Sequence, residues 1–262
     1  MEAINNLLTI MRTLRDPENG CPWDRQQGFS DIAPYTLEEA YEVVDAIERE
    51  DMKELCAELG DLLFQVVYHS QIAAEKGYFS FSDVVNAINS KLLARHPHVF
   101  ADEIVENADE QSRRWEELKA RERSDADCNS LLDQVCSGLP ALTRAQKLQL
   151  RAAAAGFDWS DIGDVKAKIE EELKELEAEI SGNKDKSGIK DEMGDLLFAC
   201  VNLARHIGID AESALRAANN KFESRFRHVE NRLKQHNKTP EQATLDEMEY
   251  YWQEAKQLHK KA

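Results

Sequence analysis

The chain has 262 residues, of which 42% are hydrophobic and 32% are charged, and its formal net charge is -17 at pH 7. This length is enough for two domains with buried cores. The negative charge argues against nonspecific DNA or RNA binding, which needs a basic surface. A polyphosphate substrate would also be repelled, unless a metal ion and local Lys or Arg side chains reverse the sign at its site.

The sequence also carries expectations about compartment. The five cysteines form neither a C-x-x-C pair nor a zinc-ligand spacing. No apolar run approaches the roughly 18 residues of a membrane span, and the N-terminus lacks the basic segment of a signal peptide. We therefore expect a reduced, cytoplasmic protein that binds neither nucleic acid nor a membrane.

The first half of the chain has the apolar spacing of amphipathic helices. Thr36 with Glu39 three residues later has the pattern of a capping box and predicts a helix start. A break is expected over residues 16–24, and Pro97 ends a helix. The predicted helices cover residues 3–15, 36–50, 52–76, 82–95 and 109–123.

The second half begins again after a segment that is small and polar at both ends. That segment, residues 125–138, is the predicted linker between domains at 1–124 and 139–262. Strand-like alternation is hard to find, so we predict an all-α protein of two tandem helical bundles. Its bundle core could form within a half, between the halves or across a dimer. The second set of predicted helices covers residues 142–155, 165–180, 189–207, 211–234 and 241–260.

The two halves share a pattern of carboxylates. Glu38-Glu39-Ala-Tyr-Glu42 and Glu58-Leu-Gly-Asp61-Leu-Leu-Phe64 recur as Glu171-Glu172-Leu-Lys-Glu175 and Glu192-Met-Gly-Asp195-Leu-Leu-Phe198, at offsets of 133 and 134. Random acidic helices would not reproduce this pattern at a nearly constant offset, so the halves arose by duplication. Basic and aromatic positions recur as well: Lys91, Arg95 and His98 match Lys221, Arg225 and His228, and Trp115 with Lys119 matches Trp252 with Lys256.

Carboxylates three residues apart lie on the same side of a helix. Two such helices packed antiparallel would bring four carboxylates together, and four anions require cations between them. Oxygen ligands of this kind suit Mg2+ or Mn2+. The alternative is a solvated acidic face, which the repeat makes less attractive. The predicted metal ligands are Glu172, Glu175, Glu192 and Asp195, with a candidate second site at Glu39, Glu42, Glu58 and Asp61.

Basic residues near these helices suggest phosphate contacts. Lys221 and Arg225 are four residues apart, and Lys168 lies one turn before the second Glu cluster, where the first half has Tyr35. Surface ion pairing is the alternative for the first two, and Trp252 either stacks on a base or packs in a core. The chain has no P-loop, no H-E-x-x-H and no nucleophile elbow, which leaves water as the nucleophile.

These motifs resemble those of the all-α nucleoside triphosphate pyrophosphatases. The resemblance to the MazG family extends over nearly the whole chain and includes Cys-Pro-Trp-Asp at 21–24, Arg-His-Pro-His-Val-Phe at 95–100, Leu-Pro-Ala-Leu at 139–142 and Gly-Phe-Asp-Trp at 156–159. It implies Mg2+-dependent hydrolysis of nucleoside triphosphates to monophosphate and pyrophosphate, broad base and sugar tolerance, and a homodimer. It also implies metal binding by Glu172, Glu175, Glu192 and Asp195, and nucleotide binding by Lys168, Glu171, Lys190, Lys221, Arg225 and Trp252.

The second half is expected to be the main catalytic site, because the first half lacks an equivalent of Lys168 and has a shorter break between its acidic helices. Water would attack the α-phosphorus in line, and one of the Glu residues would accept its proton. Which Glu does so is left open by the spacing. Two other functions remain: a non-enzymatic acidic helical module that regulates a protein partner, and a narrow pyrophosphatase for dUTP or dCTP.

Overall fold

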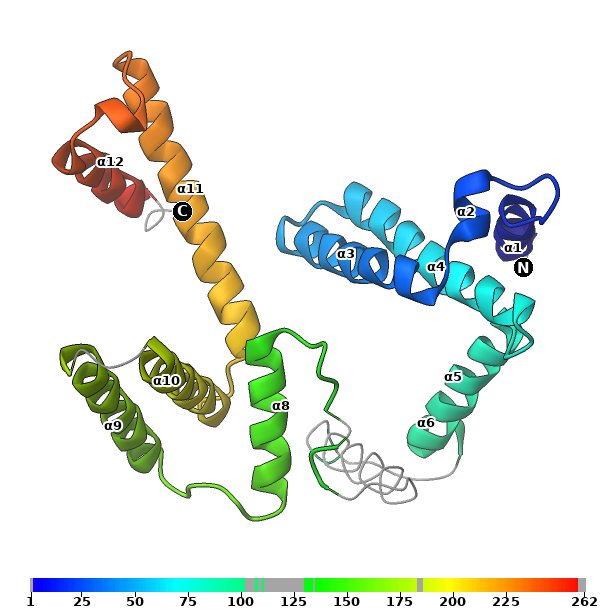
Figure 1. Cartoon of the computed structure of the whole chain (residues 1–262), viewed down its shortest axis with the longest axis horizontal. Helices are drawn as coiled ribbons and strands as arrows, with labels where there is room; N and C mark the ends of the chain where they lie inside the picture. Colours follow the sequence, from blue (N-terminus) through cyan, green and yellow to red (C-terminus); the bar gives the residue numbers. More distant parts are fainter. Residues whose placement is uncertain are drawn as a thin grey trace. The chain divides into compact units, whose positions relative to one another are not determined.

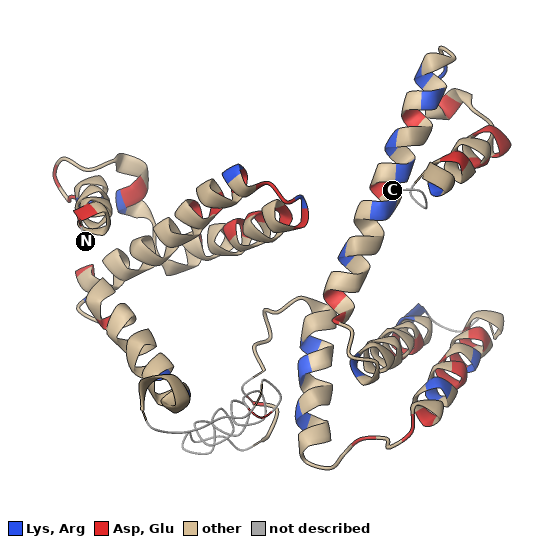
Figure 2. Ribbon diagram, turned by 180° about the vertical axis from the view of Figure 1, so that it is seen from behind, with Lys and Arg blue, Asp and Glu red and all other residues tan. Residues whose placement is uncertain are grey.

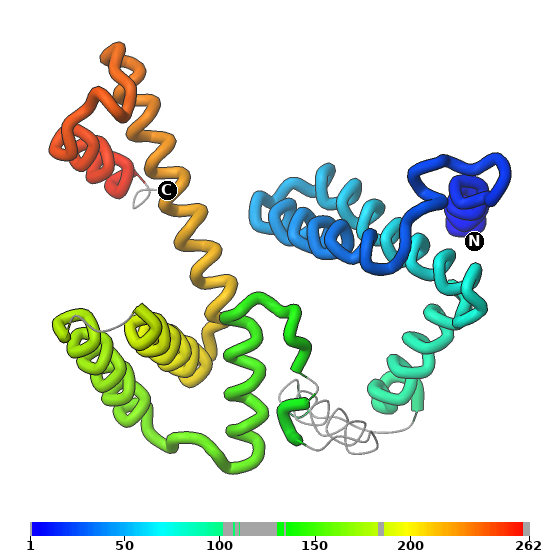
Figure 3. The backbone as a smooth tube through the Cα atoms, in the orientation of Figure 1, coloured from blue at the N-terminus to red at the C-terminus, as the bar shows by residue number. Residues whose placement is uncertain are grey.

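The computed structural model describes residues 2–101, 107, 110, 130–133, 135–182 and 186–258. The all-α prediction is confirmed, since the described residues contain helices and no strand. The chain divides into two compact units, Met1–Lys119 and Ala120–Ala262, whose courses can be followed in Figures 1 and 3. The linker at 125–138 and the domain limits of 124 and 139 stay predictions. No helix in the described part of the chain combines the length and apolar character needed to cross a lipid bilayer.

The first unit is organised around a helical hairpin. Helices α3 (Phe29–Glu48) and α4 (Met52–Glu75) pack side by side, and α1 (Glu2–Leu14) packs on α4. Met11 of α1 and Tyr68 of α4 are fully buried in the core between them, with Ile32 of α3. The remaining described elements are α2 (Pro22–Gln26), α5 (Phe81–Arg95) and α6 (Pro97–Phe100).

The second unit repeats the hairpin. Helices α9 (Ile162–Ser181) and α10 (Lys186–His206) pack against each other, and α8 (Ala141–Ala154) packs on α10. Helix α11 (Ala211–Gln235) contacts α8 at one part of its length and pairs with α12 (Leu245–Leu258), after the short 3-10 helix η1 (Pro240–Gln242). The buried side chains of the second unit include Val165, Leu176, Val201, Val229 and Leu233.

Three predicted boundaries are wrong. Helix α3 begins at Phe29, where the Asp31 carboxylate accepts a hydrogen bond from the Gly28 N–H at 2.8 Å. Thr36 lies inside that helix, and its hydroxyl is 2.9 Å from His69 Nε2. Burial of Ile32 in the core stabilises these early turns although Pro34 removes one helical hydrogen bond.

The other two corrections are smaller. The expected break at 16–24 contains the start of α2, because Pro22 occupies a first-turn position where its missing N–H costs nothing. The helix expected over 241–260 is divided into η1 and α12. The helix expected over 109–123, with Trp115 and Lys119, lies outside the described residues. Asp51, Asp161 and Asp210 each cap the helix that follows them, so the starts of α4, α9 and α11 are set locally.

Candidate metal and nucleotide site

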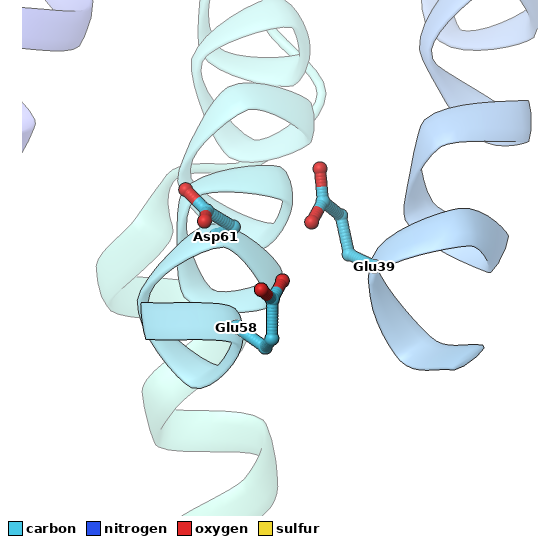
Figure 4. Close-up of side chains that lie close together, drawn as sticks. All are labelled: Glu39, Glu58 and Asp61. Carbon is cyan, nitrogen blue, oxygen red and sulfur yellow. The ribbon is translucent and has the colours of Figure 1, made fainter. Parts of the chain in front are cut away.

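The hairpin of the first unit brings together carboxylates that are distant in sequence. One oxygen each from Glu39 of α3 and from Glu58 and Asp61 of α4 lie within 4.8 Å of one another. Figure 4 shows Glu39 extending from its helix toward the two side chains of α4. This is the convergence that the i, i+3 spacing on antiparallel helices predicts.

The second unit makes the same group from its own hairpin. One oxygen each from Glu172, Glu192 and Asp195 lie within 4.8 Å of one another. Glu172 is only 5% exposed. A buried carboxylate beside two others is unfavourable unless a positive charge balances it. A set of three converging carboxylates fits a hard divalent cation such as Mg2+.

The fourth predicted ligand of each unit is not a member of these groups. Glu42 and Glu175 are close enough to influence their neighbours, however. Partial burial, followed by the charges of Glu175 and Asp195, raises the pKa of Glu192 above its usual value. Burial, followed by the charges of Asp61 and Glu42, raises the pKa of Glu39 in the same way. In both clusters, neighbouring negative charges thus disfavour the ionised form of one carboxyl group, and the role of Glu42 and Glu175 as direct ligands stays a prediction.

Lys168 distinguishes the second cluster from the first. Its Nζ lies 2.7 Å from Glu172 Oε1 and 2.8 Å from Glu171 Oε1. Hydrogen bonds to Glu171 and then to Glu172 raise the pKa of Lys168, so its ammonium form is stabilised. The corresponding residue in the first unit is Tyr35, whose ring packs edge-on against Trp23 at 6.2 Å. The first unit therefore has an uncharged ring at the position from which Lys168 contacts the buried Glu172.

A pocket of about 370 Å³ adjoins the second cluster. It lies in the second unit, among α8, α9, α10 and the loop that precedes α9. Lys168 belongs to the wall of this pocket and also to the carboxylate cluster through Glu172. The wall is largely apolar, with a few polar groups, as in sites for small molecules. It is made by Leu132, Leu148, Gln149, Ala152, Phe157, Asp158, Trp159, Val165, Lys168, Phe198, Ala199, Asn202 and Arg205.

Comparison of the repeats explains why there is space here. At the constant offset of 134, Ala199 and Asn202 of α10 stand where α4 has Gln65 and Tyr68. Tyr68 is 1% exposed, and its hydroxyl donates toward Asp24 in the core of the first unit. Smaller side chains at both positions leave room in the second unit. Most pocket residues were not predicted from the sequence, and the signal that could have found them is this difference in size between aligned repeat positions.

Four of the predicted nucleotide-binding residues lie elsewhere in the second unit. The Arg225 guanidinium of α11 lies 5.8 Å from the ring centroid of Trp252 on α12. Phe222 is 5.2 Å from the same ring, so Trp252 has aromatic and cationic neighbours of its own. Lys and Arg recur along α11 (Figure 2). Neither Lys190, Lys221, Arg225 nor Trp252 is part of the pocket wall or of the three-carboxylate group, and their roles stay predictions.

Residues 27–100 and 163–230 each match the model of the MazG nucleotide pyrophosphohydrolase domain. These segments contain the two hairpins with their carboxylate clusters. The matched segments thus place the chain in the class of MazG nucleotide pyrophosphohydrolases through the same carboxylates that the two hairpins bring together.

Full-length relatives agree with this classification. The chain is 53% identical over 257 residues to the nucleoside triphosphate pyrophosphohydrolase of Escherichia coli (strain K12), with 98% of both chains covered. It is 42% identical over 250 residues to the nucleoside triphosphate pyrophosphohydrolase/pyrophosphatase MazG of Thermotoga maritima, with 95% of this chain and 94% of the relative covered. The chain belongs to the MazG family.

Proposed function

We propose that this protein hydrolyses nucleoside triphosphates to nucleoside monophosphate and pyrophosphate, and that the second unit does so. The observation that carries the proposal is the junction between pocket and cluster. Lys168 lines a pocket of about 370 Å³ and contacts the buried Glu172 at 2.7 Å. A nucleoside in the pocket would leave its phosphates at the carboxylates. The names of the relatives from Escherichia coli and Thermotoga maritima support the same reaction.

The acidic group needs a cation to accept a polyphosphate. Glu172, Glu192 and Asp195 would hold Mg2+, or Mn2+, with Glu175 beside them. The ion would neutralise charge on the phosphates and orient the attacking water. A carboxylate of the cluster would accept a proton from that water while the water oxygen forms a bond to the α-phosphorus. The bond between the α-phosphorus and the bridging oxygen breaks, and pyrophosphate leaves with the electron pair.

The pocket suits the nucleoside part of the substrate. Phe157, Trp159 and Phe198 offer aromatic surface for a base, and the volume lies in the range of small-molecule sites. Stacking on aromatic rings is tolerant of base identity, because every base has a π-face. This supports the broad base tolerance that the family resemblance implies. We further propose that the sugar is also tolerated broadly and that the protein acts in cytoplasmic nucleotide-pool housecleaning or stress regulation.

The remaining basic residues are proposed to bind the phosphates that leave. Lys190 is exposed on α10, Lys221 and Arg225 lie on α11, and the Arg225 guanidinium lies over the ring of Trp252. We further propose a homodimer, because the second unit exposes apolar side chains that a helical bundle would normally cover. Among them are Leu173, Ile180, Met193, Leu197, Leu215 and Phe222, each between 43% and 59% exposed.

The first unit is proposed to bind a cation with little or no turnover. Its carboxylates converge like those of the second unit. Tyr35 replaces the cationic Lys168, however, and Tyr68 occupies core space that Asn202 leaves open in the repeat. A cation could thus bind at the first cluster without an adjoining place for the nucleoside.

A turnover assay tests the proposal. The protein is incubated with each of the common ribo- and deoxyribonucleoside triphosphates, with Mg2+ or with EDTA, and the products are separated. Metal-dependent formation of monophosphate and pyrophosphate is expected, with loss of turnover in Glu172→Gln and retention in Glu39→Gln. Release of diphosphate and phosphate would place the attack at another phosphorus. Cleavage of dUTP or dCTP alone would establish the narrow alternative, and no cleavage of any triphosphate would favour the regulatory module.

A further inference from the structure

One polar side chain of the pocket wall has a half-satisfied amide. Asn202 of α10 is 6% exposed and lines the pocket. Its Oδ1 accepts hydrogen bonds from Arg205 Nε at 2.9 Å and from Arg205 Nη2 at 2.8 Å. Among the described residues, no group accepts a hydrogen bond from the Asn202 amide nitrogen. The amide nitrogen is not among the side-chain atoms that are buried without a partner, so it is accessible at the pocket wall, where a ligand can accept its hydrogen bond.

Arg205 determines which end of the Asn202 side-chain amide has no partner. A guanidinium only donates hydrogen bonds, so the oxygen of Asn202 must face it and the NH2 group must face away. Arg205 is itself held, because Nη1 and Nη2 contact the two Asp158 oxygens at 2.9 and 2.5 Å. The pair is largely buried on the Arg205 side, which is 10% exposed. The donor of Asn202 is therefore presented in a fixed orientation.

The same wall offers an acceptor of equally fixed orientation. Gln149 of α8 is 7% exposed, and its Nε2 donates to the Phe198 carbonyl at 2.8 Å. This bond leaves Gln149 Oε1, which is buried and has no partner. Two amides of one pocket wall thus each have one hydrogen-bonding atom without a partner among the described residues. The atom is a donor on Asn202 and an acceptor on Gln149.

The first unit supports a ligand-directed role for these groups. Its residue at the position of Asn202 is Tyr68, which satisfies its own hydroxyl by donating to Asp24 at 3.0 Å. The hairpin thus folds with a self-satisfied side chain at this position. An Asn whose amide nitrogen remains without a partner is not required by the packing of α10.

We propose that Asn202 is a specificity-determining residue that donates a hydrogen bond to an acceptor atom of the nucleobase, and that Arg205 is the positioning residue that aims it. The inference rests on the proposed function, since it assigns the nucleoside to this pocket. Every common base carries ring-nitrogen or carbonyl acceptors, so the contact is compatible with broad base tolerance. It predicts discrimination against a base from which the contacted acceptor has been removed.

The test removes the donor and the acceptor separately. Hydrolysis is measured for ATP and for its 1-deaza, 3-deaza and 7-deaza analogues, each of which lacks one ring acceptor. Asn202→Asp keeps an oxygen for Arg205 and replaces the amide donor by an acceptor, and Asn202→Leu removes both groups. Asn86→Asp makes the same charge change on an exposed residue of α5 and is the matched control. Equilibrium binding of the same nucleotides, measured with Ca2+ in place of Mg2+, reports on the pocket without turnover.

The unaltered protein is expected to hydrolyse one deaza analogue with a kcat/KM about tenfold below that for ATP, as the loss of one buried hydrogen bond requires. Both Asn202 variants are expected to lose about the same factor on ATP and nothing more on that analogue. Equal losses on all four nucleotides would mean that Asn202 is structural and would overturn the proposal, as would equal use of all four by the unaltered protein. If no nucleotide is hydrolysed but binding shows the Asn202-dependent preference, the proposed reaction falls and the base contact stands.

Discussion

Replacement of Lys168 by Met should have opposite effects on metal binding and on turnover. In the metal-free protein Lys168 contributes a positive charge to the cluster, with its Nζ 2.7 Å from Glu172 Oε1. A divalent cation that enters the cluster competes with this charge for the same carboxylate. Its removal should therefore strengthen the binding of Mg2+, while a phosphate group of the substrate loses a cationic partner.

The size of the first effect follows from the exposure of the pair. Glu172 is buried, with 7% of its side chain exposed, but the Lys168 side chain is 33% exposed. Solvent screens such a pair, so its charge contributes about 1 kcal/mol, at the upper end for exposed ion pairs. That corresponds to roughly fivefold tighter Mg2+ binding. Loss of a charge-assisted contact to phosphate should lower kcat/KM at saturating Mg2+ roughly tenfold or more.

Isothermal titration with Mg2+ and steady-state hydrolysis of ATP measure the two effects. Lys166→Met removes the same charge from an exposed position of α9, and it should change the Mg2+ dissociation constant far less. Weaker Mg2+ binding in Lys168→Met would refute the reasoning, because the ammonium would then be supporting the cation site. Unchanged binding together with unchanged turnover would show that Lys168 is only a surface partner of Glu171.

Three further changes test other parts of the structure. Tyr68→Phe removes the hydroxyl that donates to Asp24 and should lower the free energy of unfolding by about 1–2 kcal/mol in urea titration; an equal stability would mean that this bond has no net value. Asp158→Asn removes a carboxylate whose pKa is lowered chiefly by its hydrogen bonds from Arg205. At neutral pH the unaltered protein should be more stable in thermal unfolding than the Asp158→Asn variant, because the Arg205 hydrogen bonds stabilise the ionised carboxylate in the folded state. This advantage should fade as the pH falls below about 4 and Asp158 becomes protonated. Asn202→Tyr should fill the pocket as Tyr68 fills the first unit and abolish turnover, while titration still detects Mg2+ binding; full activity in this variant would mean that the substrate does not use the pocket.

The fold class, the repeat and the family could all be predicted from local patterns in the sequence. Amphipathic periodicity and Pro and Gly breaks are local properties, so nearly all of the helices could be placed from them. The i, i+3 spacing of Glu192 and Asp195 predicts that the two carboxylates lie on the same side of their helix. The repeated motifs were specific enough to indicate the MazG family, which the matched segments confirm.

The sequence was less informative where long-range packing competes with local signals. The start of α3 at Phe29 is one case. Burial of Ile32 in the core stabilises helical turns that precede Pro34, although the proline itself signals a helix start or break. The membership of each carboxylate group is another, since Glu175 shares a helix with Glu172 and yet is not part of the group of three. Spacing fixes the side of a helix but not the distance across a hairpin.

The pocket and its chemistry depend on how distant parts of the second unit pack together. Whether a volume is filled depends on side chains from several elements at once, such as Tyr68 in one repeat and Asn202 in the other. The orientation of the Asn202 amide depends on Arg205, one turn away, and through it on Asp158 in a loop. Such properties arise from the packing of distant residues, so no local pattern of the sequence could reveal them.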